Sequence, residues 1–241
     1  MSLSRDHEWD LTPAEGIYLQ KAIKDQVDFG PPFEDEVECV AGADVSYMRK
    51  HERAFASIKV FTLRKSSAGE VQMDLVEESS AVQKIQYPYI PGLLVFREGP
   101  ALEAAWHQLE IKPDLILFDG AGIAHPRRCG LAIHLGWRWD TPALGCAKSR
   151  LIGKAEEVEL DKGSTAPLFD KNTRIGTVVR TRTRVKPLYV SPGYRTSFEQ
   201  SIRWTLTLAT TYRLPEPIRL ADHQTKTLAR QYEGQKSNER G

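Results

Sequence analysis

Two aspartates stand in segments where a carboxylate is costly. Asp44 lies inside the small apolar run at 41–45, and Asp119 directly follows the apolar run at 115–118. A buried carboxylate is strongly unfavourable unless it is paired or binds a cation. Glu98 is a third candidate, at the predicted start of the helix that precedes the Asp119 strand. The three acids therefore form a candidate site if the fold brings them together.

The ligand types indicate which metal such a site would bind. Three carboxylates without a Cys/His cluster are typical of Mg²⁺ or Mn²⁺ and not of zinc. We therefore expect Asp44, Glu98 and Asp119 to be metal ligands, provided that the strand carrying Asp44 neighbours the strand before Asp119. Each acid taken alone is equally compatible with a helix N-cap or a turn. Composition alone therefore leaves the metal site as one of two interpretations.

Five segments resemble the endonuclease V family. The two longest and most specific are YPYIPGLLVFREGP at 87–100 and FDGAGIAHPR at 118–127. ADVSY at 43–47, GCAKS at 145–149 and LPEP at 214–217 follow in the family's order and spacing. The resemblance runs from about residue 10 to residue 230 of the chain.

The resemblance implies a ribonuclease H-like α/β fold and a metal-dependent endonuclease. Such an enzyme nicks a strand on the 3′ side of a deaminated purine (hypoxanthine, the base of inosine) and leaves a 3′-OH and a 5′-phosphate. It implies Mg²⁺ as cofactor, with Mn²⁺ able to substitute. The partner it implies is DNA or RNA that contains inosine. The sequence does not decide between DNA and RNA, and it does not decide whether one or two metals act.

The family pattern also assigns further residues of the active site. Lys148 occupies the family's lysine position, where an ammonium would contact the scissile phosphate or water. His125 is placed at the rim of the site. Relatives carry His or Asp at a position on the last helix, which holds Asp222 here, followed by His223. We assign the role to Asp222.

Residues 87–91 are the best candidate for recognition of the base. Two prolines restrict this loop, so Tyr89 and Ile90, followed by Pro91, would project as an apolar wedge that parts base steps. A loop that packs on its own core is the alternative. The remaining recognition candidates are turn glycines, whose backbone groups can approach a base edge: Gly120, Gly130 and Gly145.

The segment 171–186 contains six basic residues and no acid. In a strand, Arg180, Arg182, Arg184 and Lys186 would share one face, because side chains alternate with a period of two. Such a stripe suits phosphate contacts, although a solvated strand face is an equally simple interpretation.

The elements that must position these residues follow from apolar patterning. A helix is predicted at 12–27, capped by Thr12 with Glu15 three residues on, and then an antiparallel meander and alternating helices and strands. This order describes a mixed sheet with helices on both faces. The predicted strands are 37–47, 54–63, 71–85, 115–118, 143–147, 175–185 and 188–190, and the later helices are 98–110, 130–137, 196–212 and 217–232.

Length, charge and cysteine content limit the class of protein to which the chain can belong. The chain has 241 residues with a net charge of +1, and we expect a single catalytic domain over 1–241 with a disordered tail from about 232. No apolar run approaches the roughly 18 residues of a membrane span. Three widely spaced cysteines and no secretory signal favour an intracellular, cytoplasmic protein, which we expect to be a monomer.

Two other functions stay open. One is a catalytically silent nucleic-acid-binding module on the same fold, which would have no need to keep Asp44, Glu98 and Asp119 together. The other is a different ribonuclease H-like nuclease, such as a hybrid-cleaving or junction-resolving enzyme, which would have no use for a Tyr89–Ile90 wedge. The sequence carries no P-loop, paired CxxC motif or Gly-x-Ser-x-Gly elbow, so NTPase, zinc-finger and serine hydrolase functions lack support.

Overall fold

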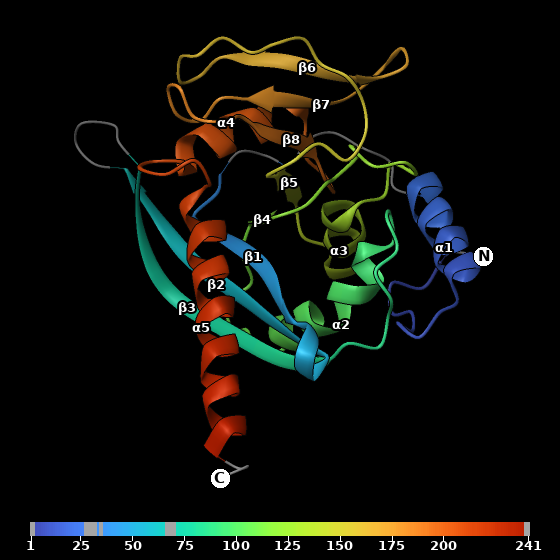
Figure 1. Cartoon of the computed structure of the whole chain (residues 1–241). Helices are drawn as coiled ribbons and strands as arrows, with labels where there is room; N and C mark the ends of the chain where they lie inside the picture. The colour runs from blue at the N-terminus through green and yellow to red at the C-terminus, as the bar shows by residue number, and fades with distance from the viewer. Residues whose placement is uncertain (1–2, 27–32, 34–35, 66–70, 239–241) are drawn as a thin grey trace.

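Eight strands form one mixed sheet in the computed structural model, which describes residues 3–26, 33, 36–65 and 71–238 (Figure 1). Their order across the sheet is β3-β2-β1-β4-β5-β8-β7-β6. The strands are β1 (Cys39–Met48), β2 (Arg53–Lys65), β3 (Val71–Lys84), β4 (Leu115–Phe118), β5 (Ala143–Ala147), β6 (Thr165–Asp170), β7 (Thr173–Val179) and β8 (Leu188–Pro192).

The first three strands form the predicted antiparallel meander. On its other side β1 runs parallel to β4, and β4 runs parallel to β5. Ala43 is paired with Phe118, and Phe118 with Gly145. The carboxyl ends of these three central strands therefore meet at one edge of the sheet, as required for the predicted site.

Helices cover both faces of the sheet (Figure 1). One core layer joins the sheet to α1 (Pro13–Gln26), α2 (Leu94–Trp106) and α3 (Leu131–Trp139). The other joins it to α4 (Phe198–Leu208) and α5 (Glu216–Asn238). The predicted α/β architecture is thus confirmed, including the Thr12–Glu15 capping box at the start of α1. None of the helices among the described residues is long and apolar enough to cross a membrane.

The predicted start of α2 is wrong by four residues. The apolar spacing of Leu102, Ala105, Trp106 and Leu109 predicted an amphipathic helix over 98–110. The helix begins instead at Leu94 and holds Pro100 in its interior. Burial of Val95 and Phe96 in the core explains the extra turn, because tertiary packing outweighs local propensity. Glu98 is consequently held rigidly inside a helix.

Three more predictions need correction. The strand predicted at 175–185 ends at Val179 as β7. The edge strand β6 was not predicted, and it contains Pro167, a residue that an edge strand tolerates. The tail predicted to be disordered from about 232 is helical, because α5 continues to Asn238. Residues 239–241 lie outside the described part of the chain. Val27, at the predicted end of α1, also lies outside it.

Candidate active site

Asp44 and Asp119 come together because their strands are neighbours in parallel register. Asp44 follows Ala43 on β1, and Asp119 follows Phe118 on β4, its partner across the ladder. Side chains alternate along a strand, so Asp44 falls on the same face as Val40, which packs towards α5. Asp119 is two residues after Leu117, which packs on that same face, so the Asp119 side chain points there as well. The two carboxylates therefore share one face at the end of the central strands.

Two further acids reach this place from the helix layers. Glu98 comes from α2 and is only 7% exposed, and Asp222 comes from α5. The approach of α5 depends on Gly42 in β1: a Cβ atom there would lie 2.1 Å from the backbone carbonyl carbon of Pro217. No larger residue fits between this strand and the first turn of α5. Within the described residues, Asp222 and not the exposed His223 meets the site.

Lys148 lies among these acids, one residue after the end of β5. Its ammonium is 2.5 Å from Asp119 Oδ2 and 3.3 Å from Asp222 Oδ1. Burial lowers the pKa of Lys148, but Asp119, Asp44 and Asp222 outweigh it and the net shift is upward. Lys148 is therefore a fixed positive charge at the centre of the predicted site.

One lysine does not neutralise the cluster. Burial and then the Asp119 carboxylate raise the pKa of Asp44 to about 8. Burial also raises the pKa of Glu98 to about 8; a hydrogen bond from Tyr47 opposes this shift, and the charges of Asp44 and Asp119 add to it. Desolvated carboxylates that repel one another in this way are stabilised by a cation.

The donor set fits a divalent metal of the hard type. Asp44, Glu98 and Asp119 offer only oxygen, which suits Mg²⁺ or Mn²⁺. In the described residues, however, no three His, Cys, Asp or Glu side chains are already arranged as a metal-binding group. Lys148 lies against the acids instead. Metal binding would therefore require Lys148 to move away from Asp119 and the carboxylates to reorient towards the metal.

The proline loop lies beside the site. It turns at Gly92, whose φ of +80° favours glycine, and leads directly into α2 and Glu98. Tyr89 is 70% exposed, so its side chain stands out from the loop. Ile90 is only partly exposed and packs against the core, so the part of the wedge that stands clear of the protein is Tyr89.

A small pocket of about 80 Å³ opens behind this loop, lined by Tyr89, Ile90, Pro91, Ala121, His125 and Gly130 among others. Short segments connect it to the acids on two sides: Ala121 is two residues from Asp119, and the loop leads to Glu98. An apolar pocket with a few polar groups is the usual form of a small-ligand site.

His125 belongs to this pocket. Its Nε2 lies 2.9 Å from the Gly92 carbonyl, and its Nδ1 accepts from the Arg127 backbone N–H at 3.2 Å. Burial and then the charge of Arg127 lower the pKa of His125 to about 4. The imidazole is therefore neutral and carries its proton on Nε2, which donates to Gly92. Its described contacts fix the loop, and the catalytic role implied by the resemblance stays a prediction.

The three candidate glycines separate by position. Gly130 lines the pocket. Gly145 is buried inside β5, where a Cβ atom would lie 2.4 Å from the Gly120 carbonyl oxygen. The close approach of these two backbone segments explains the glycine at 145 as a packing requirement. Gly130 is packed as closely, since a Cβ atom there would lie 2.2 Å from the Ala121 carbonyl oxygen, but of the three glycines it is the one that lines the pocket and is best placed for contact with a base.

The basic stripe predicted at 180–186 does not exist as a strand face, because β7 ends at Val179. Arg180 is 7% exposed and donates to the carbonyl oxygens of Val158, Glu159 and Val185. Arg180 is therefore a structural residue that closes the loop around it. Arg182, Arg184 and Lys186 are exposed in the loop after β7, so the alternation of a strand does not place them on one face.

Three residues near the acids were missed by the sequence reasoning. Tyr47 donates to Glu98 Oε1 at 2.8 Å. Lys226 lies 2.5 Å from Asp222 Oδ2, and Arg213 donates to the Lys148 carbonyl at 2.7 Å. Lys226 could have been found from its i,i+4 spacing to Asp222 on a helix. Arg213 had no such signal, because its partner is a distant backbone carbonyl.

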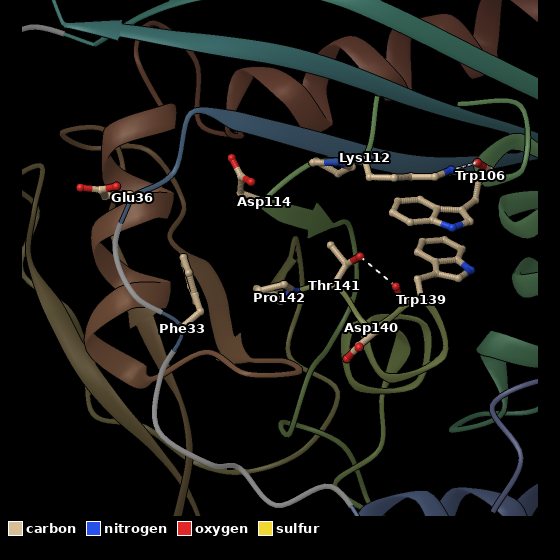
Figure 2. Close-up of a pocket in the computed structure, with 10 residues that line it drawn as sticks. Phe33, Glu36, Trp106, Lys112, Asp114, Trp139, Asp140, Thr141 and Pro142 are labelled. Carbon is tan, nitrogen blue, oxygen red and sulfur yellow. Dashed lines mark hydrogen bonds between the residues drawn. The ribbon is translucent and has the colours of Figure 1, made fainter. Parts of the chain in front are cut away.

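A larger pocket of about 550 Å³ lies elsewhere, and Figure 2 shows its stacked Trp106 and Trp139 rings. It is lined by residues just before β4 and β5, hence at the amino ends of the parallel strands, away from Asp44 and Asp119. Its Asp114 accepts two backbone N–H groups, and its Asp140 pairs with Arg5. These acids already have structural partners, so we place the active site at the carboxyl ends.

The mixed sheet and its carboxylates define a nuclease of the ribonuclease H-like class. The model of the endonuclease V family matches residues 21–223. Endonuclease V of Alkalilimnicola ehrlichii is 43% identical over 222 residues, which cover 92% of this chain and 95% of that protein. The chain belongs to the endonuclease V family and is an endonuclease.

Solved structures agree with this assignment. The crystal structure of endonuclease V from Streptomyces avermitilis has a TM-score of 0.84 at 33% identity, covering 97% of this chain and 100% of that one. The Ciona intestinalis enzyme, in complex with a 24mer DNA containing an inosine followed by a ribo-adenosine, has a TM-score of 0.74 at 27% identity, covering 91% and 98%. Membership of a nuclease family implies a divalent metal cofactor.

Proposed function

We propose that this endonuclease nicks a nucleic-acid strand on the 3′ side of a deaminated purine and leaves a 3′-OH and a 5′-phosphate. The observation that carries the proposal is the convergence of Asp44, Glu98 and Asp119 from β1, α2 and β4 beside a pocket under the proline loop. The Ciona relative bound to inosine-containing DNA supports hypoxanthine as the base.

Asp44, Glu98 and Asp119 would hold Mg²⁺, for which Mn²⁺ can substitute, with Asp222 completing the site. When bound, the metal supplies charge that activates water and stabilises the departing 3′-oxygen. Lys148 is held between Asp119 and Asp222, so its ammonium can shift to the scissile phosphate once a cation neutralises the acids. In this step Lys148 lowers the repulsion between the phosphate and the carboxylates.

The pocket would receive the extruded base. Tyr89, with Ile90 and Pro91 beneath it, fills the gap that the base leaves in the stack, at an unstacking cost that is lowest for a damaged or mispaired base. Hypoxanthine differs from adenine by a 6-oxo acceptor and an N1–H donor. Backbone groups near Gly130 can read that difference, and His125 keeps the pocket in shape through Gly92.

We also propose that residues 1–241 act as one catalytic domain and as an intracellular monomer. All three cysteines are buried and free, which suits a reducing compartment. DNA and RNA are both retained as substrates, since a 2′-OH contact would be needed to distinguish them.

The test is cleavage of matched single- and double-stranded substrates, in DNA and in RNA, each with one inosine or one adenosine. We expect a Mg²⁺-dependent nick only beside inosine. Asp119→Asn keeps the shape but loses a charged ligand, and it should abolish cleavage while substrate binding persists. Inosine-independent cleavage would contradict the proposed specificity. Binding by the wild type without a nick in Mg²⁺ or Mn²⁺ would contradict the proposed chemistry, and near-normal turnover by Asp119→Asn would refute its assignment as a ligand.

A further inference from the structure

Glu98 differs from the other proposed ligands in how it is held. Asp44 lies within β1 and Asp119 directly follows the paired strand β4, so the backbone fixes the directions of these short side chains. Glu98 has a longer side chain on a helix, with one more rotatable bond to be ordered. A glutamate of this kind needs a neighbour that fixes its carboxylate, and Tyr47 is that neighbour.

Tyr47 reaches Glu98 because of its position in β1. It is three residues beyond Asp44, so the alternation of side chains places it on the opposite face, towards α2. Tyr47 packs there against the core layer that contains α2, and its hydroxyl donates to Glu98 Oε1 at 2.8 Å. The bond occupies one carboxylate oxygen and leaves Oε2 available for a cation. The same strand thus supplies Asp44 to one side of the site and a support for Glu98 to the other.

The ring of Tyr47 is itself held. The Arg97 guanidinium lies over it, 4.8 Å from the ring centroid, and Arg97 Nη1 donates to the Tyr87 carbonyl at 2.6 Å. Arg97 therefore connects the base of the proline loop, the Tyr47 ring and the helix that carries Glu98. A tyrosine clamped in this way has little freedom to release the carboxylate it supports.

We propose that Tyr47 is a positioning residue that orients the Glu98 carboxylate for metal binding. The inference rests on the proposed metal-dependent function and goes beyond it, because it says that a side chain that is not a ligand raises the affinity of the site for its metal. Hydrogen-bond partners behind metal ligands typically change metal affinity by about 10- to 100-fold. We expect an effect at the lower end of this range, since a single neutral donor is removed.

Tyr47→Phe tests this directly, because it deletes the hydroxyl and keeps the ring under Arg97. Tyr194→Phe is the matched control. It deletes a hydroxyl that donates to the Asp140 carboxylate, also at 2.8 Å. Asp140 lies before the amino end of β5, away from the proposed metal site. Two quantities should be measured in each variant: Mn²⁺ affinity by electron paramagnetic resonance without substrate, and the Mg²⁺ dependence of nicking. Thermal melting in EDTA checks that both variants are folded.

The expected result is Mn²⁺ binding weakened about 10-fold in Tyr47→Phe. The Mg²⁺ midpoint of nicking should rise in parallel, while the rate at saturating Mg²⁺ and the KM for substrate stay near wild type. Tyr194→Phe should match wild type in all of these. Unchanged Mn²⁺ affinity in a folded Tyr47→Phe protein would overturn the inference, as would an equal loss in both variants. A wild type that binds Mn²⁺ but never nicks inosine would refute the proposed function and leave the test of Tyr47 intact.

Discussion

Replacing Glu98 with Gln should make the metal-free protein more stable while it removes the activity. Burial raises the pKa of Glu98 from its ordinary value of 4.5 to about 8, so the folded state holds this proton more tightly than the unfolded chain does. The stability that wild type gains from the protonated carboxyl is complete below pH 4.5 and is lost as the pH rises through 8. Glutamine has the shape of the protonated acid and never ionises.

The magnitude follows from the interval between the two pKa values. Each pH unit above the ordinary pKa costs wild type about 1.4 kcal/mol, so the penalty at pH 7 is about 3 kcal/mol. Glu98 is only 7% exposed, so solvent screens little of this penalty. A buried amide without full hydrogen bonding offsets about 1 kcal/mol. A net gain of about 2 kcal/mol corresponds to a rise in Tm of about 4–8 °C for a chain of this length.

The assay is thermal melting in EDTA between pH 4.5 and 8.5, followed by the same series with Mg²⁺. Glu98→Gln should melt above wild type at pH 8, and the difference should shrink towards pH 4.5. Mg²⁺ should raise the Tm of wild type more than that of the variant. Glu110→Gln, at an exposed position after α2, is the control and should change nothing. A wild type as stable as Glu98→Gln at pH 8 in EDTA would show that the carboxylates are not mutually destabilised, and the argument for a cation site would fail.

Two further changes address recognition and the corrected basic stripe. Truncation of Tyr89 and Ile90 to Ala should reduce nicking of an inosine in a duplex by a few kcal/mol of barrier, about the unstacking cost, and should affect single strands less; equal losses in a cleavage assay on both substrates would mean that the loop only supports the fold. Arg180→Gln should lower the free energy of unfolding by about 3 kcal/mol or more, because three carbonyls, including that of the buried Val158, lose a charged donor. The exposed Arg182→Gln should leave it within about 0.5 kcal/mol in the same denaturation experiment, and similar destabilisation by both would contradict the structural role assigned to Arg180.

The sequence by itself determined the fold class and most of the candidate site. Continuous apolar runs mark the buried strands, so an acid inside or directly after one is visible without coordinates, as with Asp44 and Asp119. The meander, the strand before Asp119 and the capping box at Thr12 follow from local rules that do not depend on the rest of the chain. The family motifs added Lys148 and Asp222, which composition does not distinguish from surface residues.

Only the tertiary structure decided which groups touch. Pairing of β1 with β4 is a contact between segments far apart in the chain, and no local pattern sets its register. The start of α2 was missed because the apolar spacing between residues 102 and 109 does not show that the core also buries Val95 and Phe96. Arg180 looked like a surface cation, since a sequence does not show the three carbonyls that surround it. The support of Glu98 by Tyr47 has the same origin. A hydrogen bond between residues far apart in the chain depends on how the helix layer packs on the sheet. The alternation of apolar residues shows that such layers must form, but it does not show which residues then meet.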